Sequence, residues 1–234
     1  MDPSVLDNAV WHSLAHAHHE LAERVGLAAR YDPDVSLFGG IGDDTGDDTG
    51  GDADAAWRDL QELVGPSGVA VLFRAEIPAL PKRWIRLDGG RGHQMVLREL
   101  APVDTPDARD LGPGDVGEML ALVELTRPGP FAVRTVELGG YVGVFDGARL
   151  VAMAGQRLAP PGFREISAVC THPDFRGRGL AAGLTALVAQ RILDRGERPF
   201  LHHAADNDAA RRVYEAIGFE FRRQIVFAAL GLSP

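Results

Sequence analysis

Residues 169–182 read VCTHPDFRGRGLAA, with two glycines and two arginines between an apolar run and a helical pattern. Gly177 and Gly179 carry no side chains, so a ligand can approach the backbone closely at these positions. The amides of a first helical turn have no intrahelical partners, and the helix dipole adds partial positive charge there. The stretch therefore predicts a phosphate-binding turn, with a plain strand-to-helix connection as the alternative.

A dinucleotide-binding turn is a second interpretation of the same residues. Gly177, Gly179 and Ala182 satisfy the pattern G-x-G-x-x-A. That pattern places its glycines directly after a strand, whereas residues 172–176 intervene here, and Pro173 cannot extend a central ladder. The spacing therefore disfavours a dinucleotide.

Strand and helix patterns alternate on both sides of this turn. Strands are predicted at 93–100, 141–145, 149–158, 165–171, 200–204 and 220–230, and helices at 115–127, 180–195 and 208–217. Asp146-Gly147 indicates a hairpin, and Asp206 or Asn207 can cap the last helix. This order predicts an α/β fold with a mixed sheet flanked by helices.

The region before this alternation carries no motif to which a chemistry can be assigned. We expect an amphipathic helix at 10–28, an acidic, solvated loop at 39–55, a helix at 56–64 and a strand at 69–73. The chain is accordingly predicted to consist of an N-terminal α/β region, residues 1–92, and a second domain, residues 93–234.

Charge and composition exclude several classes of protein. The chain has 234 residues and a formal charge of −9, which argues against a general nucleic-acid binder. The acid is concentrated at residues 32–59, with nine aspartates and one arginine, whereas residues 163–223 have ten arginines and eight acids. No apolar run suits a membrane helix, the first residues do not resemble a signal peptide, and the single cysteine cannot form an internal disulfide. A cytoplasmic location is therefore expected.

A second motif, NDAARRVYEAIGF at residues 207–219, narrows the class of protein to which the phosphate-binding turn could belong. Together with the first stretch, it resembles the GNAT superfamily of acyl-coenzyme A-dependent N-acetyltransferases over about residues 93–228. Arg176, Gly179 and Ala181 match the phosphate-binding signature Q/R-x-x-G-x-G/A of that family. Residues 128–147, 150–158 and 165–179 are more narrowly similar to the branch related to glycine N-acyltransferase, in which an N-terminal region can be a degenerate copy of the same fold.

The resemblance implies where acetyl-coenzyme A binds. Val169 and Thr171 would offer backbone groups to the pantetheine arm, an amide of this strand would polarise the thioester, and Asn207 would contact the pantetheine. The amides from Arg176 to Ala181 would hold the pyrophosphate. The complete predicted donor site is Val169, Cys170, Thr171, Arg176, Gly177, Arg178, Gly179, Leu180, Ala181 and Asn207, and no metal is expected.

Two residues are the candidates for catalysis. The resemblance implies that Tyr214 protonates the departing thiolate, whereas the residue pattern alone favours a buried helix aromatic. Glu165 lies eleven residues before Arg176, the spacing of the glutamate base in one branch of the family. An exposed glutamate at a strand end, with ordered water as base, is the alternative. Cys170 has the opposite strand parity to Glu165 and is expected to be a small buried residue.

The predicted activity is transfer of an acetyl group to a primary amine by direct attack. The alternative is a non-catalytic module that binds acyl-coenzyme A or a partner protein. The acceptor is expected to be a small-molecule or peptide amine, and the acidic surface favours a cationic one. Phe131, Arg134 and one of His202 and His203 are candidates for contact with it. Nucleic acid and membrane are not expected as partners, and a homodimer is left open.

Overall fold

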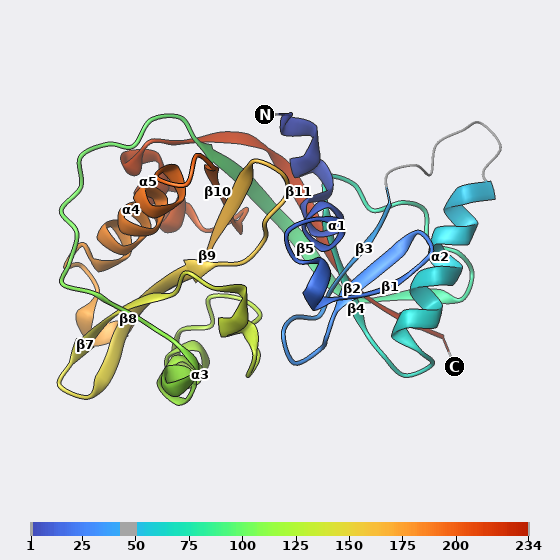
Figure 1. Ribbon diagram of the computed structural model, residues 1–234, viewed down its shortest axis with the longest axis horizontal. Coiled ribbons are helices and arrows are strands. Elements are labelled where there is room, and N and C mark those ends of the chain that lie inside the picture. Colours follow the sequence, from blue (N-terminus) through green and yellow to red (C-terminus); the bar gives the residue numbers. More distant parts are fainter. Residues whose placement is uncertain (1, 43–50, 234) are drawn as a thin grey trace.

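In the computed structural model, which describes residues 2–42 and 51–233, the described strands form one mixed sheet in the order β1-β2-β3-β4-β11-β5-β10-β9-β8-β7-β6 (Figure 1). The strands are β1 (Ala22–Val25), β2 (Ala28–Tyr31), β3 (Phe38–Ile41), β4 (Ala70–Arg74), β5 (Trp84–Leu97), β6 (Arg109–Asp110), β7 (Val142–Asp146), β8 (Arg149–Gln156), β9 (Phe163–Thr171), β10 (Arg198–Ala204) and β11 (Phe219–Leu232). The helices are α1 (Ala9–Ala15), α2 (Gly51–Val64), α3 (Val116–Thr126), α4 (Leu180–Leu193) and α5 (Asp208–Ile217).

Two long strands hold the two ends of the sheet together. β5 and β11 pair antiparallel from Leu97↔Phe219 to Trp84↔Leu232. At one end of this ladder β11 also pairs with β4, and at the other end β5 pairs with β10. The predicted division between residues 92 and 93 falls inside β5, so the backbone hydrogen bonds of the sheet continue across it.

The N-terminal and C-terminal halves have the same sequence of elements. Each has an antiparallel hairpin, β1–β2 or β7–β8, followed by a strand, a helix and a parallel strand. In the first half these are β3, α2 and β4, and in the second half β9, α4 and β10. This correspondence supports a degenerate copy of the fold in residues 1–92, which stays a prediction.

Helices cover both faces of the C-terminal half. α4 and α3 both pack on β8 and β9, and Figure 1 shows them on opposite sides of these strands. Leu184, Val188 and Ile192 of α4 recur at intervals of four residues and are fully buried. This spacing places them on one face of the helix, as the sequence pattern predicts.

The halves also share a hydrophobic core. Leu6, Tyr31 and Phe38 from the N-terminal half pack in one cluster with Phe163 and Phe200 from β9 and β10. Polar contacts span the same region: the Gln94 amide donates to the Leu6 carbonyl at 2.9 Å, and Arg222 forms an ion pair with Asp7 at 2.6 Å.

Two predictions for the N-terminal region are wrong in their bounds. The helix expected at 10–28 ends at Ala15, and residues 22–25 instead form β1, which pairs with β2 through a turn at Gly26, where φ is +47°. Pairing with β2 overrides the helical periodicity there. The bounds expected for the acidic loop at 39–55 are wrong at both ends, because residues 39–41 belong to β3 and residues 51–55 to α2; residues 43–50 lie outside the described residues.

Candidate active site

The site is centred where β9 and β10 separate. The two strands pair in parallel from Phe163↔Arg198 to Ile166↔Leu201, and the pairing stops there. Just beyond, Ala168 has φ +52°, and the register with β8 shifts at this point. A bulge of this kind bends a strand away from its neighbour. The carboxyl ends of β9 and β10 therefore diverge and leave a gap beside Val169 and Thr171.

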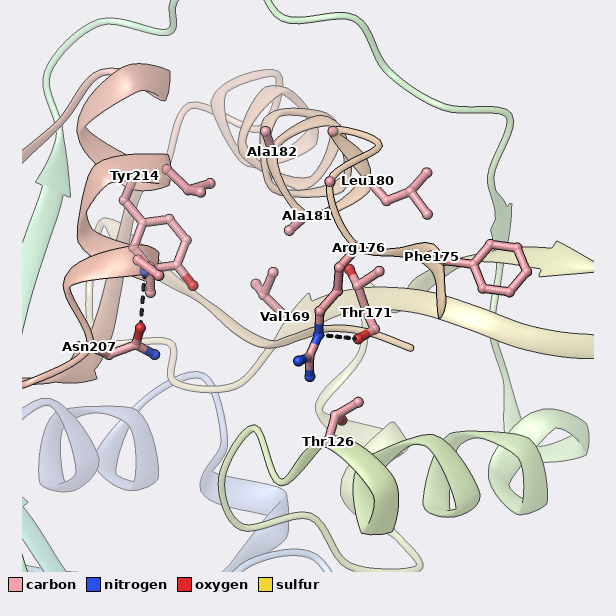
Figure 2. Close-up of a pocket in the computed structure, with 15 residues that line it drawn as sticks. Thr126, Val169, Thr171, Phe175, Arg176, Leu180, Ala181, Ala182, Asn207 and Tyr214 are labelled. Atoms are coloured by element: carbon pink, nitrogen blue, oxygen red, sulfur yellow. Dashed lines mark hydrogen bonds between the residues drawn. The ribbon is translucent and has the colours of Figure 1, made fainter. Parts of the chain in front are cut away.

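A hollow of about 510 Å³ lies at this gap. Its walls come from β9, the turn before α4, the first turn of α4, and helix α5, with the end of α3 below (Figure 2). The predicted site residues that line it are Val169, Thr171, Arg176, Gly177, Gly179, Leu180, Ala181, Asn207 and Tyr214. Tertiary structure thus brings together two motifs that are about thirty residues apart in the chain.

The turn before α4 presents backbone amides to this hollow. Gly177 and Gly179 both have φ +75°, a conformation that other residues adopt only with strain. No acidic residue lies in the first turn of α4, and Gly179 as N-cap supplies no side-chain acceptor. In the described part of the chain, the amides from Gly177 to Ala182 have no hydrogen-bond acceptor, whereas the Arg176 amide donates to the Pro173 carbonyl at 3.3 Å.

Arg176 and the strand edge complete the polar side of the hollow. Arg176 Nε lies 3.4 Å from the Thr171 carbonyl oxygen, as drawn in Figure 2. The Thr171 hydroxyl is buried without a partner among the described residues. Arg178 does not line the hollow; its guanidinium stacks on Phe175 at 4.5 Å and donates to the Asp174 carbonyl. A pyrophosphate would fit the free amides with Arg176 beside it, and an apolar arm would fit along Val169 and Leu180.

Helix α5 supplies the remaining predicted residues. Asn207 caps the helix, because its side-chain oxygen accepts from the Ala210 amide at 3.0 Å. Figure 2 shows the hydroxyl of Tyr214 directed into the hollow, and no described residue hydrogen-bonds to it. Burial raises the pKa of Tyr214 to about 12. The phenol therefore stays protonated at neutral pH and is available as a proton donor.

Cys170 lies outside the hollow, with its side chain buried in the cluster of Met119 and Tyr141 on the α3 side of the sheet. Burial raises the pKa of the Cys170 thiol to about 11. The thiol is therefore protonated at neutral pH.

Glu165 also lies outside the hollow and is completely buried. Its Oε1 accepts from Arg157 Nη2 at 2.6 Å and from His202 Nδ1 at 2.7 Å. Its Oε2 accepts from Arg157 Nε at 2.9 Å and from the Leu158 amide at 3.3 Å. Burial by itself would raise the pKa of Glu165, but the charge and hydrogen bonds of Arg157 and His202 outweigh it and hold the pKa at about 2.

A carboxylate offers about four acceptor positions, and all four are used in Glu165. An amine that needs to lose a proton would find neither access nor a free lone pair there. The role of base that the family spacing implied for Glu165 is therefore not part of the function proposed below. The spacing correctly located a glutamate on β9 but could not reveal its partners.

Sequence reasoning missed several residues that line the hollow. These are Thr126, Phe175, Ala182, Ala209, Ala210 and Val213. Ala209, Ala210 and Val213 fall within the second motif, and their helical spacing relative to Tyr214 could have identified them. Thr126 has no such signal, because only the packing of α3 under β9 brings it to the site.

The candidates for acceptor contact have different surroundings. Arg134 is held by ion pairs with Asp32 and Glu137, both at the surface. Phe131 packs against Tyr141 beside a separate small hollow. His202 and His203 both line a further hollow next to the first one.

Comparisons with known proteins agree with this geometry. Residues 141–228 match the family model for FR47-like protein. Over 98% of its length the chain superposes on 99% of a protein from Novosphingobium aromaticivorans assigned to the GNAT family of acetyltransferases, with a TM-score of 0.86 and 36% identity. A GCN5-related N-acetyltransferase from Kribbella flavida has the same fold, with a TM-score of 0.68 and 16% identity over 96% of this chain and 95% of that one.

Two curated relatives match shorter segments. The chain is 37% identical over 65 residues to mycothiol acetyltransferase from Corynebacterium aurimucosum, which is 27% of this chain and 21% of that protein. It is 36% identical over 85 residues to N-alpha-acetyltransferase RimI from Mycobacterium tuberculosis, which is 34% of this chain and 51% of that protein. The matches thus span about half or less of these relatives.

The full-length structural match shows the class of protein. The chain belongs to the GNAT family of acetyltransferases, and the predicted GNAT-type α/β fold is confirmed.

Two features are absent from the part of the chain that the structure describes. None of the described helices is long and apolar enough to cross a membrane. Within the same residues, no group of three or more histidine, cysteine, aspartate or glutamate side chains is arranged to hold a metal ion.

Proposed function

We propose that this protein transfers an acyl group, acetyl in the simplest case, from acyl-coenzyme A to a primary amine. The observation that carries the proposal is the coincidence of three features in one hollow: free amides at the start of α4, a separated strand edge on β9, and the Tyr214 hydroxyl. The two curated relatives are acetyltransferases by name, which supports the same reaction class.

In the proposed reaction the amine attacks the thioester directly. The amine nitrogen forms a bond to the acyl carbon, the carbon–sulfur bond breaks, and its electron pair leaves on sulfur. The protonated Tyr214 donates a hydrogen bond and then its proton to that sulfur. The proton released by the amine balances the one that Tyr214 gives up, and the products are an amide and free coenzyme A.

The pyrophosphate of the donor would bind at the amides of Gly177–Ala182, where the helix dipole and Arg176 favour an anion. The pantetheine would run along β9 toward Tyr214, with the Asn207 side chain beside it. A place in the branch related to glycine N-acyltransferase stays a prediction. So does a cytoplasmic location.

Calorimetric titration with acetyl-coenzyme A tests the donor, with NADH and dephospho-coenzyme A as comparisons. We expect micromolar binding of acetyl-coenzyme A and no binding of NADH. Release of free thiol in the presence of amines then tests catalysis. Binding without thiol release from any amine would favour a non-catalytic binding module, and absence of binding by folded protein would overturn the donor site.

A further inference from the structure

A second hollow, of about 220 Å³, lies beside the one that Tyr214 lines. Neighbouring segments line the two: α3 ends with Thr126 in the first hollow, and residues 128–130 line the second. Strand β10 contributes His203 to the second hollow, and the ring centroids of His203 and Tyr214 are 6.1 Å apart. A molecule in the second hollow would therefore reach the end of the first hollow where Tyr214 lies.

Most of the second hollow is apolar and aromatic. Phe38 and Phe73 line it from the N-terminal half, and Phe227 and Ile225 line it from β11. The rings of Phe38 and Phe73 stack with centroids 5.5 Å apart. Surfaces of this kind bind a ring or a branched aliphatic group by burying its apolar area.

The charged residues around this hollow are arginines. Arg157 lies over the rings of Phe38 and Phe73, at 4.9 and 5.6 Å, and its ion pair with Glu165 neutralises it. Arg91 also lines the hollow, is exposed, and forms no ion pair with any described residue. No aspartate or glutamate is among the described residues of the lining. The hollow therefore has excess positive charge, which repels a cation and attracts an anion.

His203 offers a hydrogen-bond acceptor at the end nearest Tyr214. Its Nδ1 donates to the Ala204 carbonyl at 2.8 Å, and its Nε2 is buried without a partner in the described structure. Burial lowers the pKa of His203, so the imidazole is neutral and Nε2 has a lone pair. An amine N–H is a suitable partner for that lone pair.

We infer that the second hollow binds the acceptor of the proposed acyl transfer, and that this acceptor is an amine with an aromatic or branched apolar body and an anionic group. The inference rests on the proposed function and adds the substrate class. The amine lies beside His203 at the end of the hollow nearest Tyr214, the apolar body lies against Phe38, Phe73 and Phe227, and the anionic group faces Arg91. This differs from the cationic amine that the acidic surface suggested, because the surface acids do not line the hollow.

Four amines test separately whether the acceptor needs an apolar body and whether it needs an anionic group. L-Phenylalanine has a ring and a carboxylate, phenethylamine has only the ring, glycine has only the carboxylate, and spermidine has neither and is polycationic. With acetyl-coenzyme A as donor and free thiol as readout, L-phenylalanine should have the highest kcat/KM and spermidine the lowest. We expect kcat/KM for L-phenylalanine to be about tenfold above the values for phenethylamine and for glycine, and each of these to be about tenfold above the value for spermidine.

Charge reversal at Arg91 tests the anionic contact. Arg91→Glu should lower kcat/KM for L-phenylalanine by about tenfold or more, which corresponds to about 1.4 kcal/mol or more, and should raise kcat/KM for phenethylamine. Arg83→Glu is the matched control, since it makes the same change of net charge at an exposed arginine of no described hollow. That variant should leave the preference unchanged, and both variants should bind acetyl-coenzyme A as the parent does.

The outcomes distinguish this inference from the proposed function. If spermidine is the best acceptor, or if Arg91→Glu leaves the order of amines unchanged, the acceptor class is overturned while acyl transfer stands. If acetyl-coenzyme A binds but L-phenylalanine is neither bound nor acetylated, the inference is likewise overturned. If acetyl-coenzyme A does not bind, the proposed function fails, and calorimetry of L-phenylalanine with the parent and with Arg91→Glu still decides what the second hollow binds.

Discussion

The hydroxyl of Tyr214 is the group through which the proposed reaction can be tested at the scale of a single atom. Tyr214→Phe removes that oxygen and leaves the ring in its core position. We expect kcat to fall about a hundredfold or more, with the affinity for acetyl-coenzyme A little changed. Tyr141→Phe is the matched control, because Tyr141 is also a buried tyrosine but lies in the cluster on the α3 side. Equal kcat in the parent and Tyr214→Phe would remove the hydroxyl from the mechanism.

The pH dependence of turnover is a further test of the same group. An ordinary tyrosine loses its proton near pH 10, whereas burial raises the pKa of Tyr214 to about 12. The proton donor is therefore still present at pH 10, and kcat with saturating substrates should not decline between about pH 8 and pH 10. A decline in this range that is absent from Tyr214→Phe would show that the phenol ionises earlier than its burial implies.

The buried ion pair of Glu165 with Arg157 should contribute to the stability of the fold. Glu165→Gln leaves the Arg157 cation without its partner in a buried site, which should lower the free energy of unfolding by about 3–5 kcal/mol. Glu197→Gln is the control: Glu197 also pairs with an arginine, Arg164, but is partly exposed, so about 0–1 kcal/mol is expected. Denaturant unfolding measures both. A Glu165→Gln variant with parental stability and lost turnover would restore the base role.

The contribution of Glu165 to the free energy of unfolding should also depend on pH in the acid range. Its pKa is about 2 in the folded protein and 4.5 as the ordinary value, so the unfolded chain takes up the proton first as the pH falls. The stabilisation is complete above pH 4.5 and is lost as the pH falls through 2. The free energy of unfolding should fall less steeply across this window in Glu165→Gln than in the parent.

At the scale of an element, the start of α4 is the feature to test. Gly179→Glu places a carboxylate beside the free amides at a position with φ +75°. It should abolish binding of acetyl-coenzyme A and cost about 1–2 kcal/mol of stability through backbone strain. Calorimetry and denaturant unfolding measure the two effects.

Gly196, just after α4, provides a matched control. Its φ is +76°, and a Cβ added there would meet nothing within 4 Å, as at Gly179. Gly196→Glu should therefore lose similar stability while keeping the affinity for acetyl-coenzyme A. If both variants lost affinity for acetyl-coenzyme A to a similar degree, backbone strain alone would explain the effect of Gly179→Glu.

At the scale of the whole molecule, the two halves depend on each other. β5 and β11 run through both, and Leu6 and Phe38 pack in one cluster with Phe163 and Phe200. A fragment of residues 93–234 would lose the first nine residues of β5 and expose that cluster. We expect it to lack a cooperative thermal transition, measured by near-ultraviolet circular dichroism against the full chain. A cooperative transition in the fragment would establish residues 93–234 as an independent domain.

The C-terminal elements could be predicted from the sequence because their signals are local. The glycine turn, the cap at Asn207, the hairpin at Asp146-Gly147 and the apolar faces of α4 and α5 depend on residues within a few positions of each other. The same rules predicted a helix at 10–28 and failed after Ala15, because pairing with β2 decides the structure of residues 22–25.

By itself, the sequence determined the glycine turn before α4, the position of Tyr214 on its helix and the family, since each depends on spacing along the chain. Only the tertiary structure decided that all acceptor positions of the Glu165 carboxylate are occupied and that β9 and β10 diverge after Ile166. It also decided that a second hollow, with arginines and no acids among its described lining residues, lies beside Tyr214. The physical reason is that a buried charge takes its properties from partners distant in the chain. Glu165 meets His202 across 37 residues, and no local pattern encodes that contact.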